Sequence, residues 1–149
     1  MRWPSTIPAG TVYTHPIISL DIMATITALA EVEIASERPL DGVNLLPFVT
    51  NKNKEAPHDY LFWRDFIRNG MAVRSGDFKL VDERKRDKLG CAVFNLVEDV
   101  SEKVNLSKID LDRNEELLEK HTAWKAQLKS TAFPTLGNHK WWIKEAVEE

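Results

Sequence analysis

The sequence predicts an α+β fold in which a small antiparallel four-stranded sheet is packed by a C-terminal helix. Apolar and polar residues alternate on both sides of Ser75-Gly76-Asp77, which predicts two half-buried strands joined by a tight turn, with Gly76 free to take a positive φ. A third alternating run covers residues 92–97, and an amphipathic helical pattern follows Asp112. Because such a sheet buries one face, this helix is its expected cover.

The first 18 residues are expected to form an extended connector. They contain three prolines, which exclude a continuous helix or a central strand. From Ser19 onward the apolar residues recur at three- and four-residue spacing, which predicts a helix that ends near Glu33. Ser19 is its expected N-cap, and Asp21 in the first turn suits the positive end of the helix dipole.

The segment after this helix predicts a boundary between two structural units. Pro39-Leu40-Asp41-Gly42 has the composition of a turn, and a short apolar patch surrounds Pro47. Residues 51–57 are polar and form the expected boundary. The aromatic-rich run at residues 60–63 has strand propensity and is expected to supply the fourth strand of the sheet.

Pairs of carboxylates mark the expected starts of the later helical elements. Asp99 and Glu102 have the spacing of a capping box for one short turn, and Asp112 and Glu115 repeat it ahead of the long helical pattern. His121 falls on the apolar side of that helix. A lone histidine in such a place is more often a packed core residue than a ligand.

Length and composition exclude several classes of protein. The 149 residues suit one domain, or a small domain with a piece of another, and a formal net charge of −3 gives no reason to expect nucleic acid. The basic residues at 84–88 are interleaved with acidic ones and are expected to form a solvated loop. No apolar run reaches about 18 residues, so we expect no membrane span. Residues 132–149 contain helix breakers and either dock onto the domain or begin a last helix.

The residue pattern alone predicts no active site. The four histidines are scattered, and none pairs with another at a spacing of three or four residues. The glycines are isolated from one another, so no phosphate-binding loop is expected, and no nucleophile motif occurs. The single cysteine, Cys91, cannot form an internal disulfide and is expected to be a small buried thiol.

Six stretches, in this order, resemble the C-terminal part of the sulfatases, enzymes of the alkaline-phosphatase-like superfamily. They are RWPSTIPAG at 2–10, SLDIMATI at 19–26, PLDGVNLLP at 39–47, LFWR at 61–64, AVRSGDFKL at 72–80 and FNLVEDVSEKVNL at 94–106. The chain departs from the family pattern at Ser5, where glycine is usual, and at Ala24 and Val100, where proline is usual. Each is a local substitution that the fold should tolerate.

The resemblance implies hydrolysis of sulfuric esters by a formylglycine nucleophile with a divalent cation, calcium being the expected ion. The family motifs that carry these groups lie upstream of the matched region, and Cys91 does not match the formylglycine motif. No catalytic or metal-binding residue is therefore carried over to this chain. The resemblance also implies that residues 1–50 are the end of a truncated large α/β domain and residues 57–149 the C-terminal subdomain, so the first helix should expose apolar surface.

Three hypotheses for function remain open. The chain is an inactive C-terminal fragment of a sulfatase, or the C-terminal part of a complete arylsulfatase-type enzyme, or a stand-alone protein-interaction module. In the second case the N-terminal catalytic part lies on another chain or upstream of a misplaced start, and it is the expected partner. Because sulfatases are usually exported, the parent enzyme would be periplasmic or secreted.

A complete enzyme would place the C-terminal subdomain at the border of the substrate cleft. Trp63, Arg64 and Arg74 are the candidates for its rim, because an aromatic face and guanidinium groups suit sulfated carbohydrates or aryl sulfates. The structural alternative is that Trp63 belongs to the core and that both arginines are solvated strand ends.

Overall fold

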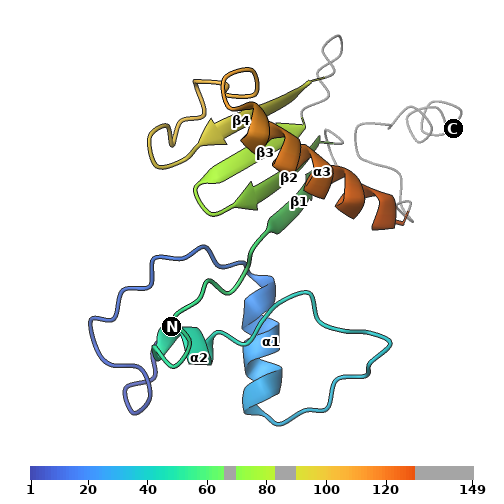
Figure 1. Ribbon diagram of the computed structural model, residues 1–149. Coiled ribbons are helices and arrows are strands. Elements are labelled where there is room, and N and C mark those ends of the chain that lie inside the picture. Colours follow the sequence, from blue (N-terminus) through green and yellow to red (C-terminus); the bar gives the residue numbers. More distant parts are fainter. Residues whose placement is uncertain (66–69, 83–89, 130–149) are drawn as a thin grey trace, which may run out of the picture. The chain divides into compact units, whose positions relative to one another are not determined.

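The computed structural model describes residues 1–65, 70–82 and 90–129, so the basic segment at 84–88 and residues 132–149 lie outside the description (Figure 1). The chain divides into two compact units, Met1–Asp59 and Tyr60–Glu149. The assignment of these units to particular parts of a sulfatase stays a prediction. Among the described helices, none has the length and apolar character needed to cross a membrane.

The first unit contains two helices, α1 (Leu20–Leu29) and α2 (Leu46–Val49), and no strand among its described residues. Helix α1 ends before the expected Glu33 because Glu31 adopts a left-handed conformation with φ 52°. The N–H of Val32 then donates to the carbonyl of Thr27 at 3.0 Å, which satisfies one of the last carbonyls of the helix. The helix is stopped by its own C-terminal turn.

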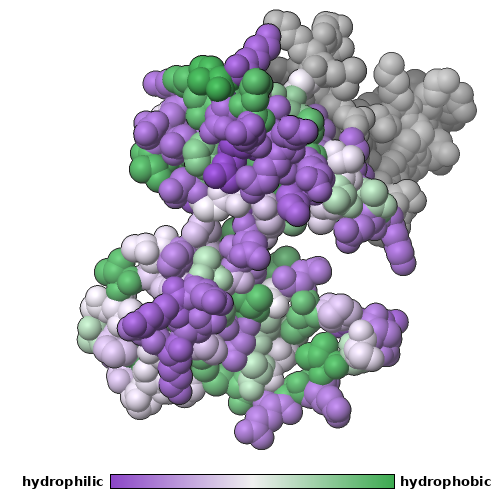
Figure 2. Space-filling view, in the orientation of Figure 1, coloured by the Kyte–Doolittle hydropathy of each residue, from purple (hydrophilic) through white to green (hydrophobic). Residues whose placement is uncertain are grey.

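Helix α1 buries its polar side and exposes its apolar side. Asp21, Ala24, Thr25 and Thr27 are buried. Its larger apolar residues are all 45–58% exposed, namely Leu20, Ile22, Met23, Ile26 and Leu29. Hydrophobic residues are accordingly visible on the surface of the first unit in Figure 2. The expected exposed apolar surface on this helix is confirmed.

The second unit contains the four-stranded antiparallel sheet that the sequence predicts. Its strands are β1 (Leu61–Asp65), β2 (Gly70–Ser75), β3 (Phe78–Asp82) and β4 (Cys91–Asn95), in the spatial order β1-β2-β3-β4. Gly76, in the turn between β2 and β3, has φ 53°, as the turn chemistry requires.

Helix α3 (Leu111–Gln127) covers one face of this sheet (Figure 1). Val73, Leu80 and Val93 lie opposite one another on three adjacent strands, and Leu117 of α3 packs on them. All four are fully buried. The buried face of the strands and the apolar side of α3 therefore form one core. This confirms the expectation that the C-terminal helix covers the sheet.

The expected capping boxes are wrong in detail. Helix α3 is capped by Asp110, whose carboxylate accepts the N–H of Arg113 at 3.1 Å, and not by Asp112 with Glu115. In the earlier turn, Asp99 accepts the N–H of Lys103 at 2.6 Å, while Glu102 forms an ion pair with Lys79.

Candidate functional site

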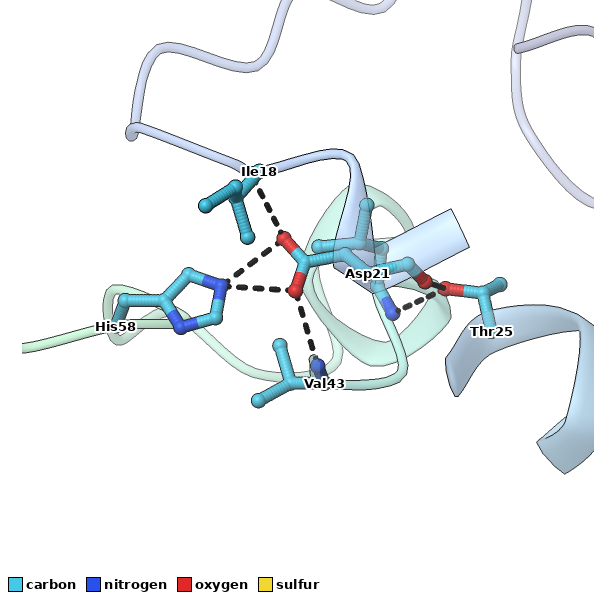
Figure 3. A network of polar contacts seen from close by, with 6 residues as sticks. Ile18, Asp21, Thr25, Val43 and His58 are labelled. Carbon is cyan, nitrogen blue, oxygen red and sulfur yellow. Dashed lines mark hydrogen bonds and ion pairs between the residues drawn. The ribbon is translucent and has the colours of Figure 1, made fainter. Parts of the chain in front are cut away.

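A buried carboxylate is the centre of a polar network in the first unit (Figure 3). The side chain of Asp21, in the first turn of α1, is fully buried. Its Oδ2 accepts the N–H of Ile18 at 2.9 Å and its Oδ1 accepts that of Val43 at 3.0 Å. Nε2 of His58 lies 2.9 Å from both carboxylate oxygens. We call Asp21, Ile18, Val43 and His58 the Asp21 clamp, because they join three separate segments of the first unit.

Gly42 allows the second segment to approach α1. A Cβ atom at this position would lie 2.3 Å from the carbonyl oxygen of Leu20, so no larger residue fits without moving the backbone. The close approach brings the N–H of Val43 to the carboxylate of Asp21. The turn that the sequence predicts at residues 39–42 therefore serves to dock this loop on the helix.

Thr25 extends the contact by one helical turn. Its hydroxyl donates to the carbonyl of Asp21 at 2.7 Å and accepts the N–H of Leu45 at 3.0 Å. Leu45 is buried, so its N–H needs a partner within the protein. Side chains of α1 thus satisfy two backbone donors of the loop that precedes α2.

Ser19 occupies the expected N-cap position of α1, but its side chain makes no capping hydrogen bond. Its backbone angles, φ −60° and ψ −24°, are already helical. Asp21 accepts the N–H of Ile18, which precedes the helix, and so ties the incoming chain to the first turn. Asp21 therefore does more than balance the helix dipole.

Hydrogen bonds keep the buried carboxylate ionised. Burial by itself would raise the pKa of Asp21, but the hydrogen bonds from Ile18, His58 and Val43 lower it below its ordinary value of 3.8. The two oxygens already accept from these three donors and have no exposed surface. The geometry suits a structural anchor that orders three segments, because no substrate atom can reach the carboxylate.

The sheet does not place the three predicted rim residues together. Neighbouring residues of a strand point to opposite faces. Trp63 and Arg74 belong to the face away from α3, where they are diagonal neighbours on β1 and β2. Arg64 pairs with Met71 on the face that α3 covers. Trp63 is 39% exposed, and Arg74 Nε donates to the carbonyl of Gly76 at 2.8 Å.

The described residues do not form a site for the cation that the resemblance implies. Among them, no group of three or more His, Cys, Asp or Glu side chains converges in a way that could hold a metal ion. Cys91 is half-buried on β4, and burial, followed by the nearby Asp82, raises the pKa of its thiol. The thiol therefore stays protonated at neutral pH and is a poor nucleophile.

His121 lies where the helical pattern places it. It is a residue of α3, is 3% exposed, and its Nε2 lies 3.6 Å from Oδ2 of Asp82 at the end of β3. The side chain of Asp82 is 13% exposed, so His121 is the more buried partner, which is the environment of a packed residue.

Known proteins resemble both the sequence and the fold of this chain, although no family model matches it. Steryl-sulfatase of Homo sapiens is 34% identical over 62 residues, which are 42% of this chain and 11% of that protein. The crystal structure of Ps i-CgsB in complex with k-i-k-neocarrahexaose matches 96% of this chain with a TM-score of 0.71 and 25% identity. The structure of BT4656 with its substrate D-glucosamine-2-N,6-O-disulfate matches 85% with a TM-score of 0.67 and 22% identity, a likeness of fold.

The chain spans only part of each of these proteins. It covers 34% of Ps i-CgsB and 27% of BT4656, compared with 11% of human steryl-sulfatase. The similarity therefore describes one portion of each relative.

Proposed function

The chain is homologous to the sulfatases and resembles their C-terminal portion, and from this premise we propose that it acts as the C-terminal part of a sulfuric ester hydrolase. The observation that carries the proposal is the agreement of two likenesses, 34% identity to a steryl-sulfatase over 62 residues and a fold match over 96% of the chain. The proposed substrate class is sulfated carbohydrate, supported by the disulfated glucosamine that BT4656 takes as its substrate.

In this proposal the chain has no hydrolytic activity by itself. The nucleophile and the cation are supplied by a catalytic part of the enzyme that this chain completes. The chain contributes a rigid first unit, held by the Asp21 clamp, and a sheet that borders the substrate.

The apolar side of α1 is the proposed contact with the catalytic part. Its five large apolar residues are each 45–58% exposed, although the helix buries an aspartate and two threonines on its other side. A helix in a finished domain normally buries its apolar stripe and not its polar one. The reversed arrangement supports a further protein surface as its cover.

Trp63 and Arg74 are the proposed substrate contacts of the second unit. They share the face of the sheet away from α3, with an indole that is 39% exposed and a guanidinium group on the adjacent strand. Arg64 lies on the opposite face and serves as the matched control. In the complete enzyme, Arg74→Ala should raise KM for a sulfated sugar several-fold, whereas Arg64→Ala should leave KM unchanged. Equal effects of both variants would remove the rim role.

Sulfate release tests the proposed function directly. The 149-residue chain and a longer polypeptide that contains it would be compared on D-glucosamine-2-N,6-O-disulfate and on an aryl sulfate. We expect release only by the longer polypeptide. A product isolated from its source at 17.1 kDa whose α1 partner is not a sulfatase, and whose complex with that partner releases no sulfate, would instead favour the stand-alone interaction module.

A further inference from the structure

A hollow with a mixed polar and apolar lining lies in the first unit, apart from the Asp21 clamp. It is lined by residues 11–15 of the N-terminal segment and by residues around the end of α2, Phe48 to Lys54, and its volume is about 570 Å³. We call it the Tyr13 hollow. Its size falls within the roughly 300–1,000 Å³ that small-molecule sites occupy.

The walls combine aromatic, apolar and amide groups. The rings of Tyr13 and His15 lie 5.5 Å apart at an angle of 50°, and Phe48 contributes apolar surface. Asn53 is fixed in place because its side-chain oxygen accepts the N–H of Glu55 at 2.9 Å. That bond leaves the NH₂ group of Asn53 as a donor toward a ligand. Such a mixture is typical of sites for sugars, which present both apolar faces and hydroxyl groups.

The charge of the hollow favours an anion. None of the described residues that line it is an aspartate or a glutamate, and Lys54 supplies a positive charge. Asn51, next along the same wall, holds a left-handed backbone with φ 59°, which fixes the turn that carries Lys54. A sulfate group entering here would meet a cation and no repelling carboxylate.

The Tyr13 hydroxyl is a polar group that the chain leaves unsatisfied. Its oxygen is shielded from solvent and has no hydrogen-bond partner among the described residues. Burial raises the pKa of Tyr13, so the group remains a neutral donor. A buried hydroxyl without a partner is unfavourable, and it can bond a ligand oxygen once the ring turns it toward the hollow.

We propose that the Tyr13 hollow binds one sulfated sugar unit. The rings of Tyr13 and His15 pack against the apolar face of the sugar, Asn53 binds a hydroxyl group, and Lys54 pairs with the sulfate. This inference rests on the proposed function, because it takes its ligand class from there. It assigns that ligand to residues 11–15 and 48–54, where neither the sequence motifs nor the rim residues point.

Binding to the full 149-residue chain tests the site. The probe is D-glucosamine-2-N,6-O-disulfate, with unsulfated glucosamine as the comparison, and binding is followed by amide chemical shifts. We expect shifts concentrated at residues 11–15 and 48–54, and at least tenfold weaker binding for Lys54→Met. Lys52→Met is the matched control, because Lys52 is exposed in the same turn but does not line the hollow. It should change the affinity less than twofold.

Tyr13→Phe gives a second readout. It should weaken binding without lowering the unfolding temperature of the free chain, because the hydroxyl has no partner to lose. Equal losses for Lys52→Met and Lys54→Met, shifts confined to the second unit, or no binding at all would overturn the site.

The complete enzyme separates this inference from the proposed function. If Lys54→Met releases sulfate with an unchanged KM, the proposed binding site in the Tyr13 hollow is wrong, while the proposed hydrolase function stands. If the probe binds specifically at the Tyr13 hollow but no longer polypeptide releases sulfate, the proposed hydrolase function is wrong, while the proposed binding site stands.

Discussion

Asp21 shows how a single buried charge can organise a segment of irregular chain. Removing a carboxylate from water costs on the order of several kcal/mol, and the cost is offset only when its oxygens are fully hydrogen-bonded. Asp21 meets this condition with two backbone donors and His58. The first unit has few buried apolar residues, so this polar anchor carries much of its order.

Asp21→Ala should therefore destabilise the chain strongly. The substitution leaves the N–H groups of Ile18 and Val43 and the ring of His58 without their acceptor, and we expect a loss of about 3 kcal/mol. Asp41→Ala, at an exposed position in the adjacent loop, is the control and should change stability by less than about 0.5 kcal/mol. Urea unfolding measures both variants, and similar midpoints for the two would contradict the role of the clamp.

Acid should weaken the same anchor. The pKa of Asp21 is lower in the folded chain than its ordinary 3.8, so the unfolded chain binds the proton first as pH falls. Its contribution to stability is present above pH 3.8 and disappears as pH drops through the lower, folded pKa. The free-energy difference between the wild type and Asp21→Asn should be largest near neutral pH and should shrink in that acidic window. A difference that stays constant down to pH 2 would show that the carboxylate charge contributes nothing.

At the scale of elements, the local pattern predicted which segments fold and missed how they connect. The alternation of apolar and polar residues around Gly76 predicts β2 and β3, and the apolar stripe containing Leu117 predicts α3. These predictions hold because the apolar side chains of the three elements are buried against one another. The three- and four-residue spacing of apolar residues in α1 predicts a helix, but it does not predict which side of the helix is buried. That side is decided by Gly42 and His58, which are 21 and 37 positions from Asp21 and leave no local signal.

The same limit explains the capping residues. A spacing of three residues occurs at Asp112 and Glu115, but the N-cap of α3 is Asp110, two residues earlier. The backbone at position 110 is not helical and that at Asp112 is already helical, so Asp110 is placed to accept the N–H of Arg113. A carboxylate motif shows that a helix begins nearby, and the backbone decides which residue caps it.

Asp110→Ala and Asp112→Ala should differ in stability for this reason. Loss of the capping acceptor should lower the free energy of unfolding by about 1 kcal/mol in Asp110→Ala. Asp112 offers only a favourable charge in the first turn, so its replacement should cost about 0.5 kcal/mol or less. Thermal unfolding of the two variants distinguishes them, and a larger effect at Asp112 would restore the capping box that the sequence suggested.

At the scale of the whole molecule, each described unit exposes one group of side chains that can contact another molecule. In the second unit, Trp63 is 39% exposed near Arg74 on the sheet face away from α3, and in the first unit the exposed group is the apolar side of α1. The two differ in chemistry. An indole with a guanidinium group suits a polar, anionic ligand, whereas a row of aliphatic side chains suits another protein surface.

Charged substitutions on α1 test this division. Ile22 and Ile26 are 58% and 55% exposed and lie one helical turn apart, so Ile22→Glu with Ile26→Glu places two charges in the middle of the apolar row without touching the buried side of the helix. Because burying an unpaired carboxylate in an apolar interface is strongly unfavourable, the affinity of the double variant for the catalytic part should fall at least a hundredfold.

The same double variant should also reduce self-association of the isolated chain in sedimentation experiments, since an exposed apolar stripe promotes non-specific contact. Val97 and Val100, 71% and 81% exposed in the second unit, supply the matched double variant to glutamate, which should leave both properties unchanged. If the α1 variant still assembles and supports sulfate release, the catalytic part packs elsewhere, and the apolar side of α1 needs another explanation.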